Sequence, residues 1–181
     1  MLGLKRGGVA LAPHEEAWEA EAARTAELLR KLLGVSAAGA EHVGSTAVRG
    51  IEAKPIIDIA VAARSLEEIK SKAALLGRYG FIFRGEDVPG QLLFVIEDEA
   101  RGVVTHHIHI VEAGGAAWRD YIGLRDYLNA FPREAARYGA LKMELARRFP
   151  ADRKSYTAGK AALIAELLAE AREWRRGSAA R

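Results

Sequence analysis

Apolar residues in the first third of the chain recur at two different spacings. Over Pro13–Leu33 they return every three to four positions, which is typical of a helix with one buried face. Pro55–Val61 is a short apolar run rich in β-branched side chains, which is typical of a buried strand. A shorter segment, Glu41–Val43, predicts a strand that ends at the tight turn Gly44-Ser45-Thr46.

The rest of the chain predicts further strands and then only helices. Ser65, with Glu68 three residues later, is typical of a helix N-terminus and predicts a helix to about Leu76. Turn-forming clusters at Gly85–Gly90 and Asp98–Gly102 then separate apolar segments. These segments predict strands over Phe81–Phe83, Gln91–Ile96 and Val103–Val111. Helical spacing after Ala116 predicts three helices, over about Ala117–Leu128, Arg133–Arg148 and Tyr156–Trp174.

Together these elements predict an α/β (α+β) fold. We expect a small mixed β-sheet backed by helices, with a C-terminal helical segment of about three helices. A length of 181 residues fits a single domain, and no repeat or low-complexity linker interrupts the pattern. The sheet-containing core is expected at about residues 9–112 and the helical segment at about 116–175.

Composition excludes several kinds of chemistry. The chain contains no cysteine, which excludes disulfides, thiolate metal ligands and cysteine nucleophiles. No apolar run approaches the roughly 20 residues that span a bilayer. The basic N-terminus, Met1–Val9, lacks the long apolar core of a signal peptide. We therefore expect a cytoplasmic protein that does not contact a membrane.

Charge is distributed unevenly. The net charge of +3 combines −3 over residues 1–118 with +6 over residues 119–181. A basic C-terminal third would attract phosphate-bearing ligands, although solvated helices decorated with arginine are the simpler interpretation. Direct nucleic-acid binding is not expected from this charge alone, and the sequence leaves the oligomeric state open.

The segment around the Gly-Ser turn carries the most informative chemistry. At a strand end, Gly44 and Ser45 allow backbone N–H groups and a hydroxyl to approach an anion closely. Asp58 lies in the middle of an apolar strand, where a carboxylate is costly unless it is paired, hydrogen-bonded or bound to a metal. These residues predict a triphosphate cradle, with Thr46 in the same turn, opposite a metal ligand. The alternative is that Asp58 only hydrogen-bonds a loop.

Three of the five histidines fall in one predicted strand. Side chains on a strand alternate between its faces, so His107 and His109 point together while His106 joins the other face. Two imidazoles at this spacing, completed by Asp58, are suitable ligands for Zn²⁺, Mn²⁺ or Fe²⁺. The alternatives are that the histidines hydrogen-bond buried polar groups or phosphate, or that one acts as a general base.

Cationic and aromatic residues elsewhere could complete a phosphate site. Lys54 lies at the mouth of the strand that carries Asp58. Arg125, Lys142 and Lys160 fall on three different predicted helices, which could converge as a polyphosphate clamp. Tyr156 shares a helix face with Lys160 and is a candidate to stack on a base. The alternatives are a solvated lysine, a structural ion pair at Arg125, and a tyrosine packed at a helix start.

Several of these motifs, in this order, resemble the GrpB-like family, a branch of the polymerase-beta-type nucleotidyltransferase superfamily. The resemblance covers nearly the whole chain. It rests on Gly44-Ser45-Thr46-Ala47-Val48-x-Gly50, Ala53-Lys54-Pro55-Ile56-Ile57-Asp58-Ile59, Trp18, His107-Ile108-His109, Arg125-Asp126-Tyr127-Leu128, Tyr138 with Leu141-Lys142, and Tyr156 with Lys160.

This resemblance implies a nucleotidyltransferase fold in which carboxylates hold two metals at the α-phosphate. Active superfamily members carry Asp-x-Asp/Glu on the acidic strand and a third acid on a later strand. This chain has Ala60 where the second acid belongs, histidines on the later strand, and Arg49 where the family usually has proline. The departures argue against a symmetric site with two Mg²⁺ ions.

The sequence therefore predicts a protein that binds an NTP with a divalent metal (Mg, Mn or Zn) and transfers a nucleotidyl group. The acceptor would be an unidentified small molecule or protein. Asp58, His107 and His109 are the expected catalytic and metal-binding residues. The expected phosphate- and nucleotide-binding residues are Gly44, Ser45, Thr46, Lys54, Arg125, Lys142, Tyr156 and Lys160. Two alternatives are a catalytically weakened module that binds a nucleotide or coenzyme, and a metal-dependent hydrolase or phosphoesterase that uses the same Asp and His residues.

Overall fold

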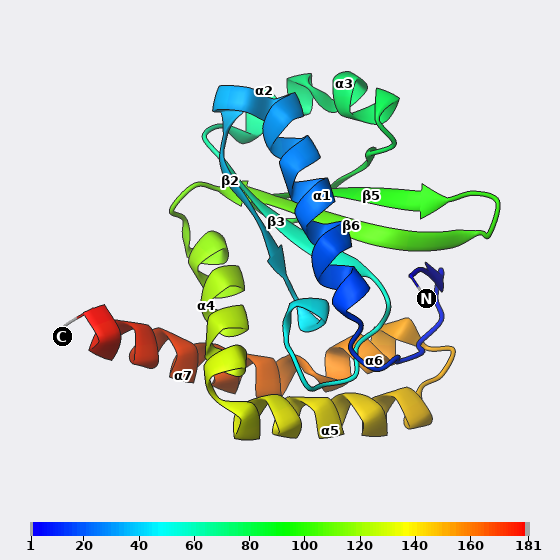
Figure 1. Cartoon of the computed structure of the whole chain (residues 1–181), viewed down its shortest axis with the longest axis vertical. Helices are drawn as coiled ribbons and strands as arrows, with labels where there is room; N and C mark the ends of the chain where they lie inside the picture. The colour runs from blue at the N-terminus through cyan, green and yellow to red at the C-terminus, as the bar shows by residue number, and fades with distance from the viewer. Residues whose placement is uncertain (1, 180–181) are drawn as a thin grey trace.

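A computed structural model describes residues 2–179 of the chain. Within these residues, six strands form one mixed sheet with the order β2-β3-β6-β5-β4, and β1 pairs with the start of β6 (Figure 1). β3 and β6 are parallel, and the other pairings are antiparallel. The strands are β1 (Leu4–Lys5), β2 (Ala37–Val43), β3 (Ile57–Ala63), β4 (Ile82–Val88), β5 (Gln91–Asp98) and β6 (Val103–Glu112). The predicted mixed sheet backed by helices is confirmed.

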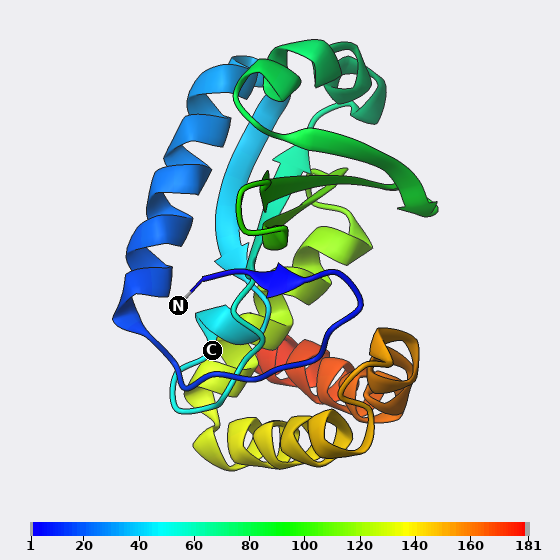
Figure 2. The ribbon, with the colours of Figure 1, turned by 90° about the vertical axis from the view of Figure 1, so that its right-hand side faces the viewer.

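Helices cover both faces of the sheet and one of its ends. α1 lies along one face, and the later helices lie below the sheet in Figure 1, with α4 rising against β2, β3 and β6 (Figures 1 and 2). The long helices are α1 (Glu16–Leu33), α4 (Ala116–Ala130), α5 (Pro132–Arg148) and α7 (Ala161–Ala179). The short ones are α2 (Leu66–Ser71), α3 (Ala73–Arg78) and α6 (Arg153–Gly159). None of the helices described is long and apolar enough to cross a bilayer.

The main core lies between α1 and the sheet. Residues of α1 at helical spacing, among them Trp18 and Leu29, pack against alternate residues of β3, including Ile57 and Ile59. Because side chains on a strand alternate between its faces, Asp58 lies on the opposite face. Burial of the α1 face therefore directs the carboxylate toward the helices at the C-terminal end of the chain.

The helix that was predicted from Ser65 begins where expected. The Ser65 side chain accepts a hydrogen bond from the Glu68 backbone N–H at 3.3 Å, as an N-cap does. The Glu68 carboxylate bonds to the Ser36 hydroxyl and not to the backbone of Ser65. In place of the one predicted helix, this segment forms two short helices, α2 and α3, which meet at Lys72.

Other elements also differ from the predicted ones, and β2 begins at Ala37, four residues before its predicted start. β4 continues through part of the Gly85–Gly90 cluster, because register shifts between Phe83 and Val88 let the strand keep pairing with β5. The last predicted helix is two, α6 and α7, so four helices follow the sheet within the described residues. Gly159 ends α6 where a Cβ would meet Leu145 Cδ2 of α5 at 2.6 Å, which allows these helices to approach closely. β1 was not predicted, because two residues carry no periodicity.

β2 stands at one end of the strand order, and arginine side chains bond to its backbone. The carbonyl of Ala40 accepts a hydrogen bond from Arg30 of α1. The carbonyl of His42 accepts one from Arg125 of α4 at 3.0 Å.

Candidate metal and phosphate site

The Gly-Ser turn follows β2 directly and lies against Asp58. Gly44 has φ 71° and ψ −168°, and the short 3₁₀ helix η2 (Ser45–Ala47) begins after it. A Cβ at Gly44 would collide with the Asp58 carboxylate and lie 3.0 Å from its Cβ and Cγ. Glycine is therefore required at this position for two reasons: the positive φ, and the close approach of its backbone to the carboxylate.

Buried hydrogen bonds fix the turn in place. Thr46 is 1% exposed, and its Oγ1 lies 2.9 Å from His42 Nε2 and 3.5 Å from the Ile56 carbonyl oxygen. Burial lowers the pKa of His42 to about 4, although nearby Asp58 opposes the shift. A neutral His42 can donate Nε2–H to Thr46, whose own hydroxyl then donates to the Ile56 carbonyl. The loop before β3 and the turn after β2 are thus joined.

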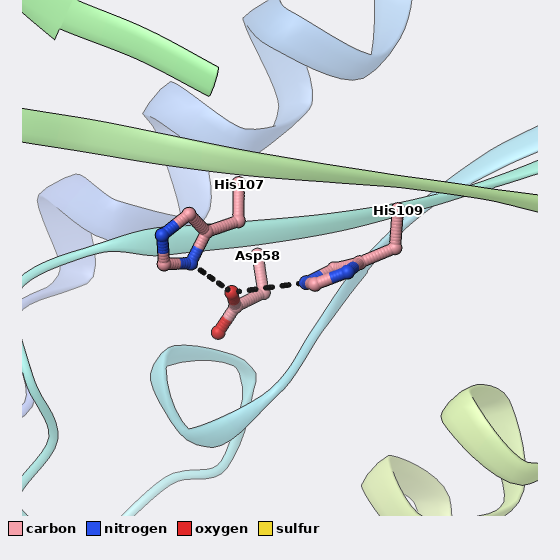
Figure 3. Close-up of side chains that lie close together, drawn as sticks. All are labelled: Asp58, His107 and His109. Carbon is pink, nitrogen blue, oxygen red and sulfur yellow. Dashed lines mark hydrogen bonds and ion pairs between the residues drawn. The ribbon is translucent and has the colours of Figure 1, made fainter. Parts of the chain in front are cut away.

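Asp58 and the two predicted histidines come together on neighbouring parallel strands. In the β3–β6 register, Asp58 pairs with His107 and Ala60 pairs with His109. Asp58 Oδ1 lies 3.2 Å from His107 Nδ1 and 3.4 Å from His109 Nε2 (Figure 3). One donor atom from each of the three residues falls within 4.8 Å of the others. The three side chains therefore converge on one point.

The electrostatics of this group favour an ionised carboxylate. Removal from bulk water raises the pKa of Asp58, but hydrogen bonds from His107 and His109 outweigh that effect and hold its pKa well below its ordinary value. Two imidazoles and one ionised carboxylate are a suitable donor set for a transition metal such as Zn²⁺ or Mn²⁺. The residues present therefore fit a single divalent ion.

The third histidine faces the other way, as alternation predicted. His106 is 3% exposed, with Nε2 3.3 Å from Thr25 Oγ1 of α1 and Nδ1 2.9 Å from Thr105 Oγ1. Burial lowers its pKa to about 4. His106 belongs to the core beneath α1 and not to the group around Asp58.

Asp58 and the two histidines line a cavity of about 480 Å³ that also receives residues from the Gly-Ser turn, α4, α5, α6 and α7. Ten of the eleven predicted site residues line it: Gly44, Ser45, Thr46, Lys54, Asp58, His107, His109, Arg125, Tyr156 and Lys160. The volume falls in the range of small-molecule sites.

The remaining predicted residue, Lys142, lies outside the lining of this cavity. Its side chain is 1% exposed, and Nζ donates a hydrogen bond to the Glu52 carbonyl at 2.5 Å and lies 4.8 Å from the centre of the Tyr138 ring. Burial lowers the pKa of Lys142 to about 7. In this position the lysine ties α5 to the loop before β3.

One end of the cavity carries three cationic side chains, and the Asp58 carboxylate acts on its two lysines from a distance without a direct ion pair. Lys54 Nζ lies 5.6 Å and Lys160 Nζ 4.5 Å from the centre of the Tyr156 ring. Burial lowers the pKa of both lysines, that of Lys160 to about 8, and Arg153 near Lys54 adds repulsion. Within residues 2–179, no ion pair is formed by Lys54, Lys160 or Arg153. An anion is the ligand that such a group lacks.

Arg125 lines the cavity but already has several partners. Its NH1 lies 3.1 Å from Glu41 Oε2 and 3.0 Å from the His42 carbonyl, and Nε donates to Asp126 at 2.9 Å. The predicted ion pair with Asp126 is present. Binding of phosphate by Arg125 remains a prediction.

Four residues of the site were not predicted as site residues: Arg153, described above, and Gln91, Tyr121 and Tyr138. The Gln91 amide nitrogen lies 3.1 Å from His109 Nδ1, and Tyr121 donates its hydroxyl proton to Gln91 Oε1 at 3.0 Å while its ring stacks on His109. Tyr138 shares a hydrogen bond with Ser45. A polar residue at the start of a buried strand was the one available signal, at Gln91. The two tyrosines reach the site through helix packing, which local pattern does not reveal.

Ala60, which stands where the superfamily pattern has a second acid, is packed in an apolar cluster. Ala60 is fully buried in a small apolar cluster with Val43 and Ile122 of α4. Among the residues described, Asp58, His107 and His109 are the one group that could hold a metal ion. These donors could hold one ion, and metal binding stays a prediction.

The family model described as "GrpB protein" matches residues 8–170. This chain belongs to the GrpB family. It is 36% identical over 173 residues to the glutamate-rich protein GrpB of Alkalihalophilus pseudofirmus, an alignment that covers 94% of this chain and 99% of that protein. The resemblance seen in the sequence is confirmed.

Solved structures agree with this family and fold. The crystal structure of the conserved protein GrpB from Enterococcus faecalis aligns with a TM-score of 0.83 at 28% identity, covering 91% of this chain and 99% of that one. The Cid1 poly(U) polymerase, bound to MgGTP, aligns with a TM-score of 0.52 at 15% identity, covering 75% of this chain and 44% of that one. The second likeness concerns the fold alone, and it supports the similarity of GrpB proteins to nucleotidyltransferases.

Proposed function

We propose that this GrpB protein binds a nucleoside triphosphate together with one divalent metal ion and transfers the nucleotidyl group to an acceptor. The observation that carries the proposal is the layout of one cavity. The Asp58, His107 and His109 donors lie in the same cavity as a cationic group that has no carboxylate partner within the described residues. A metal-dependent reaction of a phosphate ester or anhydride needs both parts.

The cationic end suits the triphosphate. Lys54, Arg153 and Lys160 would neutralise the β- and γ-phosphates, whose charges replace the missing counter-ions. Both lysine ammonium groups lie near the Tyr156 ring, at 5.6 and 4.5 Å from its centre, so an anion bound by them would lie beside this ring. Gly44 lies against Asp58, so the turn would lie beside the phosphate nearest the metal ligands.

The reaction would form one bond and break another at the α-phosphorus. An acceptor oxygen or nitrogen attacks the α-phosphorus, the anhydride bond to the β-phosphate breaks, pyrophosphate leaves, and the acceptor proton passes to water. A bound divalent ion supplies Lewis acidity to the phosphate oxygens. Asp58 and the histidines would hold that ion, and Gln91 with Tyr121 would orient the His109 ring from behind.

A second candidate is a metal-dependent phosphoesterase, and the environment of Ala60 favours it. Because Ala60 packs beneath Ile122, no carboxylate stands where a second metal would bind. A site with one ion and two histidines suits attack by water as well as attack by an acceptor. This activity would need a metal but would not consume NTP.

Thermal unfolding of the wild type and of Asp58→Asn tests the proposal. Each NTP is added with Mn²⁺, with Zn²⁺ and without metal. A ligand at 100 times its Kd stabilises by about 2.7 kcal/mol, which corresponds to a rise in Tm of roughly 5–10 °C for a domain of this size. We expect a rise that needs both NTP and metal and that is lost in Asp58→Asn. Asp98→Asn, the same charge change at the remote end of β5, is the control and should respond as the wild type does.

The outcomes separate the candidates. A shift with metal alone and none with any NTP would overturn nucleotide binding and favour the phosphoesterase. Nucleotide binding without release of pyrophosphate in the presence of any acceptor tested would favour the weakened binding module instead.

A further inference from the structure

Four arginines line a second hollow, on the outer side of α4. Arg119 of α4 and Arg172, Arg175 and Arg176 of α7 line a groove of about 750 Å³ between the two helices. Asp120 is the one carboxylate among its lining residues. The groove therefore carries a net positive charge, and the nucleotide site proposed above does not use it.

The arginines differ in how firmly they are held. Arg172 is bound to Asp120 through two hydrogen bonds of 2.9 and 2.6 Å. Arg175 reaches Asp126 only at 3.4 Å, and Arg119 donates to the carbonyl of Gly114. Within residues 2–179, Arg119 and Arg176 form no ion pair with a carboxylate. Two guanidinium groups are thus available for an anion.

Small residues open the space between the helices. Ala116 and Gly123 of α4 and Ala171 of α7 belong to the groove lining. The Arg175 stem lies against α4, since a Cβ at Gly123 would be in ordinary contact with Arg175 Cδ, at 3.5 Å. The guanidinium groups are thereby carried at the rim of a hollow and not on a convex surface.

The groove adjoins the metal and phosphate cavity. Asp120, Leu124 and Leu168 line both hollows, so α4 and α7 form a wall that the two share. The lysines around Tyr156 come from the junction of α6 and α7 and from the loop before β3, whereas the arginines come from α4 and α7. The two cationic groups therefore approach the site from different elements.

We propose that the groove between α4 and α7 binds the acceptor of the reaction, and that this acceptor is a small molecule bearing at least two phosphate groups. The inference rests on the proposed function. An arginine guanidinium can bind a phosphate through two parallel hydrogen bonds. The groove has two guanidinium groups without a carboxylate partner in the described part of the chain and two with one, which suits a ligand that bears more than one anionic group. The groove has the volume of a small-molecule site.

Calorimetric titration with 2,3-bisphosphoglycerate tests the groove. The titration uses the full chain with Lys54→Gln, Arg153→Gln and Lys160→Gln, which removes the competing cationic group of the cavity. We expect binding to persist in this background and to weaken about tenfold or more when Arg119→Gln and Arg176→Gln are added, because each removes a charge-assisted hydrogen bond. Arg147→Gln on α5, also an exposed arginine, is the matched control and should leave the affinity unchanged.

Other outcomes overturn the proposal or limit it. Equal affinity with and without Arg119 and Arg176 would overturn the groove as a phosphate site. Binding of a single-stranded RNA of about 20 nucleotides far more tightly than the bisphosphate, with loss in the same arginine variants, would overturn the assignment to a small acceptor. NTP binding is measured separately by thermal unfolding of the groove variants. If the NTP fails to bind while the bisphosphate binds through the arginines, the transferase proposal fails and the anion groove stands.

Discussion

Ala60 pairs with His109 across the parallel β3–β6 ladder, and its side chain lies fully buried against Ile122. Asp58 is two residues earlier on the same face of β3. The position that would supply a second carboxylate to a two-metal site is thus occupied by the packing of α4 on the sheet. The candidate metal donors on this face are therefore one aspartate and two histidines.

Replacing Ala60 with aspartate is expected to damage the fold and not to create a second metal site. A carboxylate in this apolar cluster would be unpaired, which costs several kcal/mol. We expect Ala60→Asp to lower the free energy of unfolding in urea by about 2–5 kcal/mol. Ala136→Asp, on an exposed position of α5, should change it by less than about 0.5 kcal/mol. A stable Ala60→Asp variant that binds two Mn²⁺ ions would contradict this interpretation.

Replacing Gly44 with alanine is expected to affect both stability and metal binding. The change introduces strain at positive φ and drives a methyl group into the Asp58 carboxylate. We expect a loss of about 2–4 kcal/mol in unfolding free energy and weaker Zn²⁺ binding in calorimetry. Gly50→Ala has nearly the same φ, 76°, but open space around it. That control should lose about 1 kcal/mol and bind Zn²⁺ as the wild type does. Equal effects of the two changes would show that contact with Asp58 is unimportant.

Lys160 is expected to oppose stability and favour ligand binding. Burial, with repulsion from Lys54, already lowers its pKa to about 8, so the charged form is held at a cost near neutral pH. Lys160→Gln should therefore raise the Tm of the free protein and lower its affinity for inorganic tripolyphosphate by about tenfold. Lys154→Gln, an exposed neighbour on α6, should change neither. A lower Tm in Lys160→Gln would show that the lysine stabilises the cavity instead.

Lys142 is expected to make stability depend on pH above neutrality. Its pKa is about 7 in the folded chain and 10.5 for the free side chain. Between these values the unfolded chain binds more protons, so stability rises as pH increases from 7 toward 9, by at most about 1.4 kcal/mol per pH unit from this group. Urea unfolding of Lys142→Met should show a shallower rise over the same range. Lys54 and Lys160 also have lowered pKa values, so part of the slope should remain. An unchanged slope would contradict a buried, weakly protonated Lys142.

The local sequence pattern was sufficient to predict elements that bury one face and expose the other. The α1 periodicity, the strand around Asp58 and the N-cap at Ser65 appear in the structure because each depends on neighbours in sequence. The alternation that separated His106 from His107 also follows from one strand alone. The convergence of Asp58 with the two histidines could be stated only as conditional on β3 lying beside β6.

What the sequence could not show depends on pairing and packing between distant segments. β4 passes through a glycine-rich cluster because its partner strand tolerates bulges, which composition does not encode. The break at Lys160 follows from close contact between α6 and α5. Tyr121 and Tyr138 enter the site from helices whose orientation was unknown, and Lys142 turns toward a backbone carbonyl for the same reason.

The arginines that bond to β2 also bear on association between copies of the chain. A strand at the end of a sheet ordinarily offers free carbonyl groups to which a strand of another molecule can add, with aggregation as the result. Here two of those acceptors, at Ala40 and His42, are already taken by guanidinium groups from α1 and α4. Arg125 belongs to this arrangement and also lines the site cavity. A residue that lines the cavity therefore also occupies a backbone acceptor at the edge of the sheet.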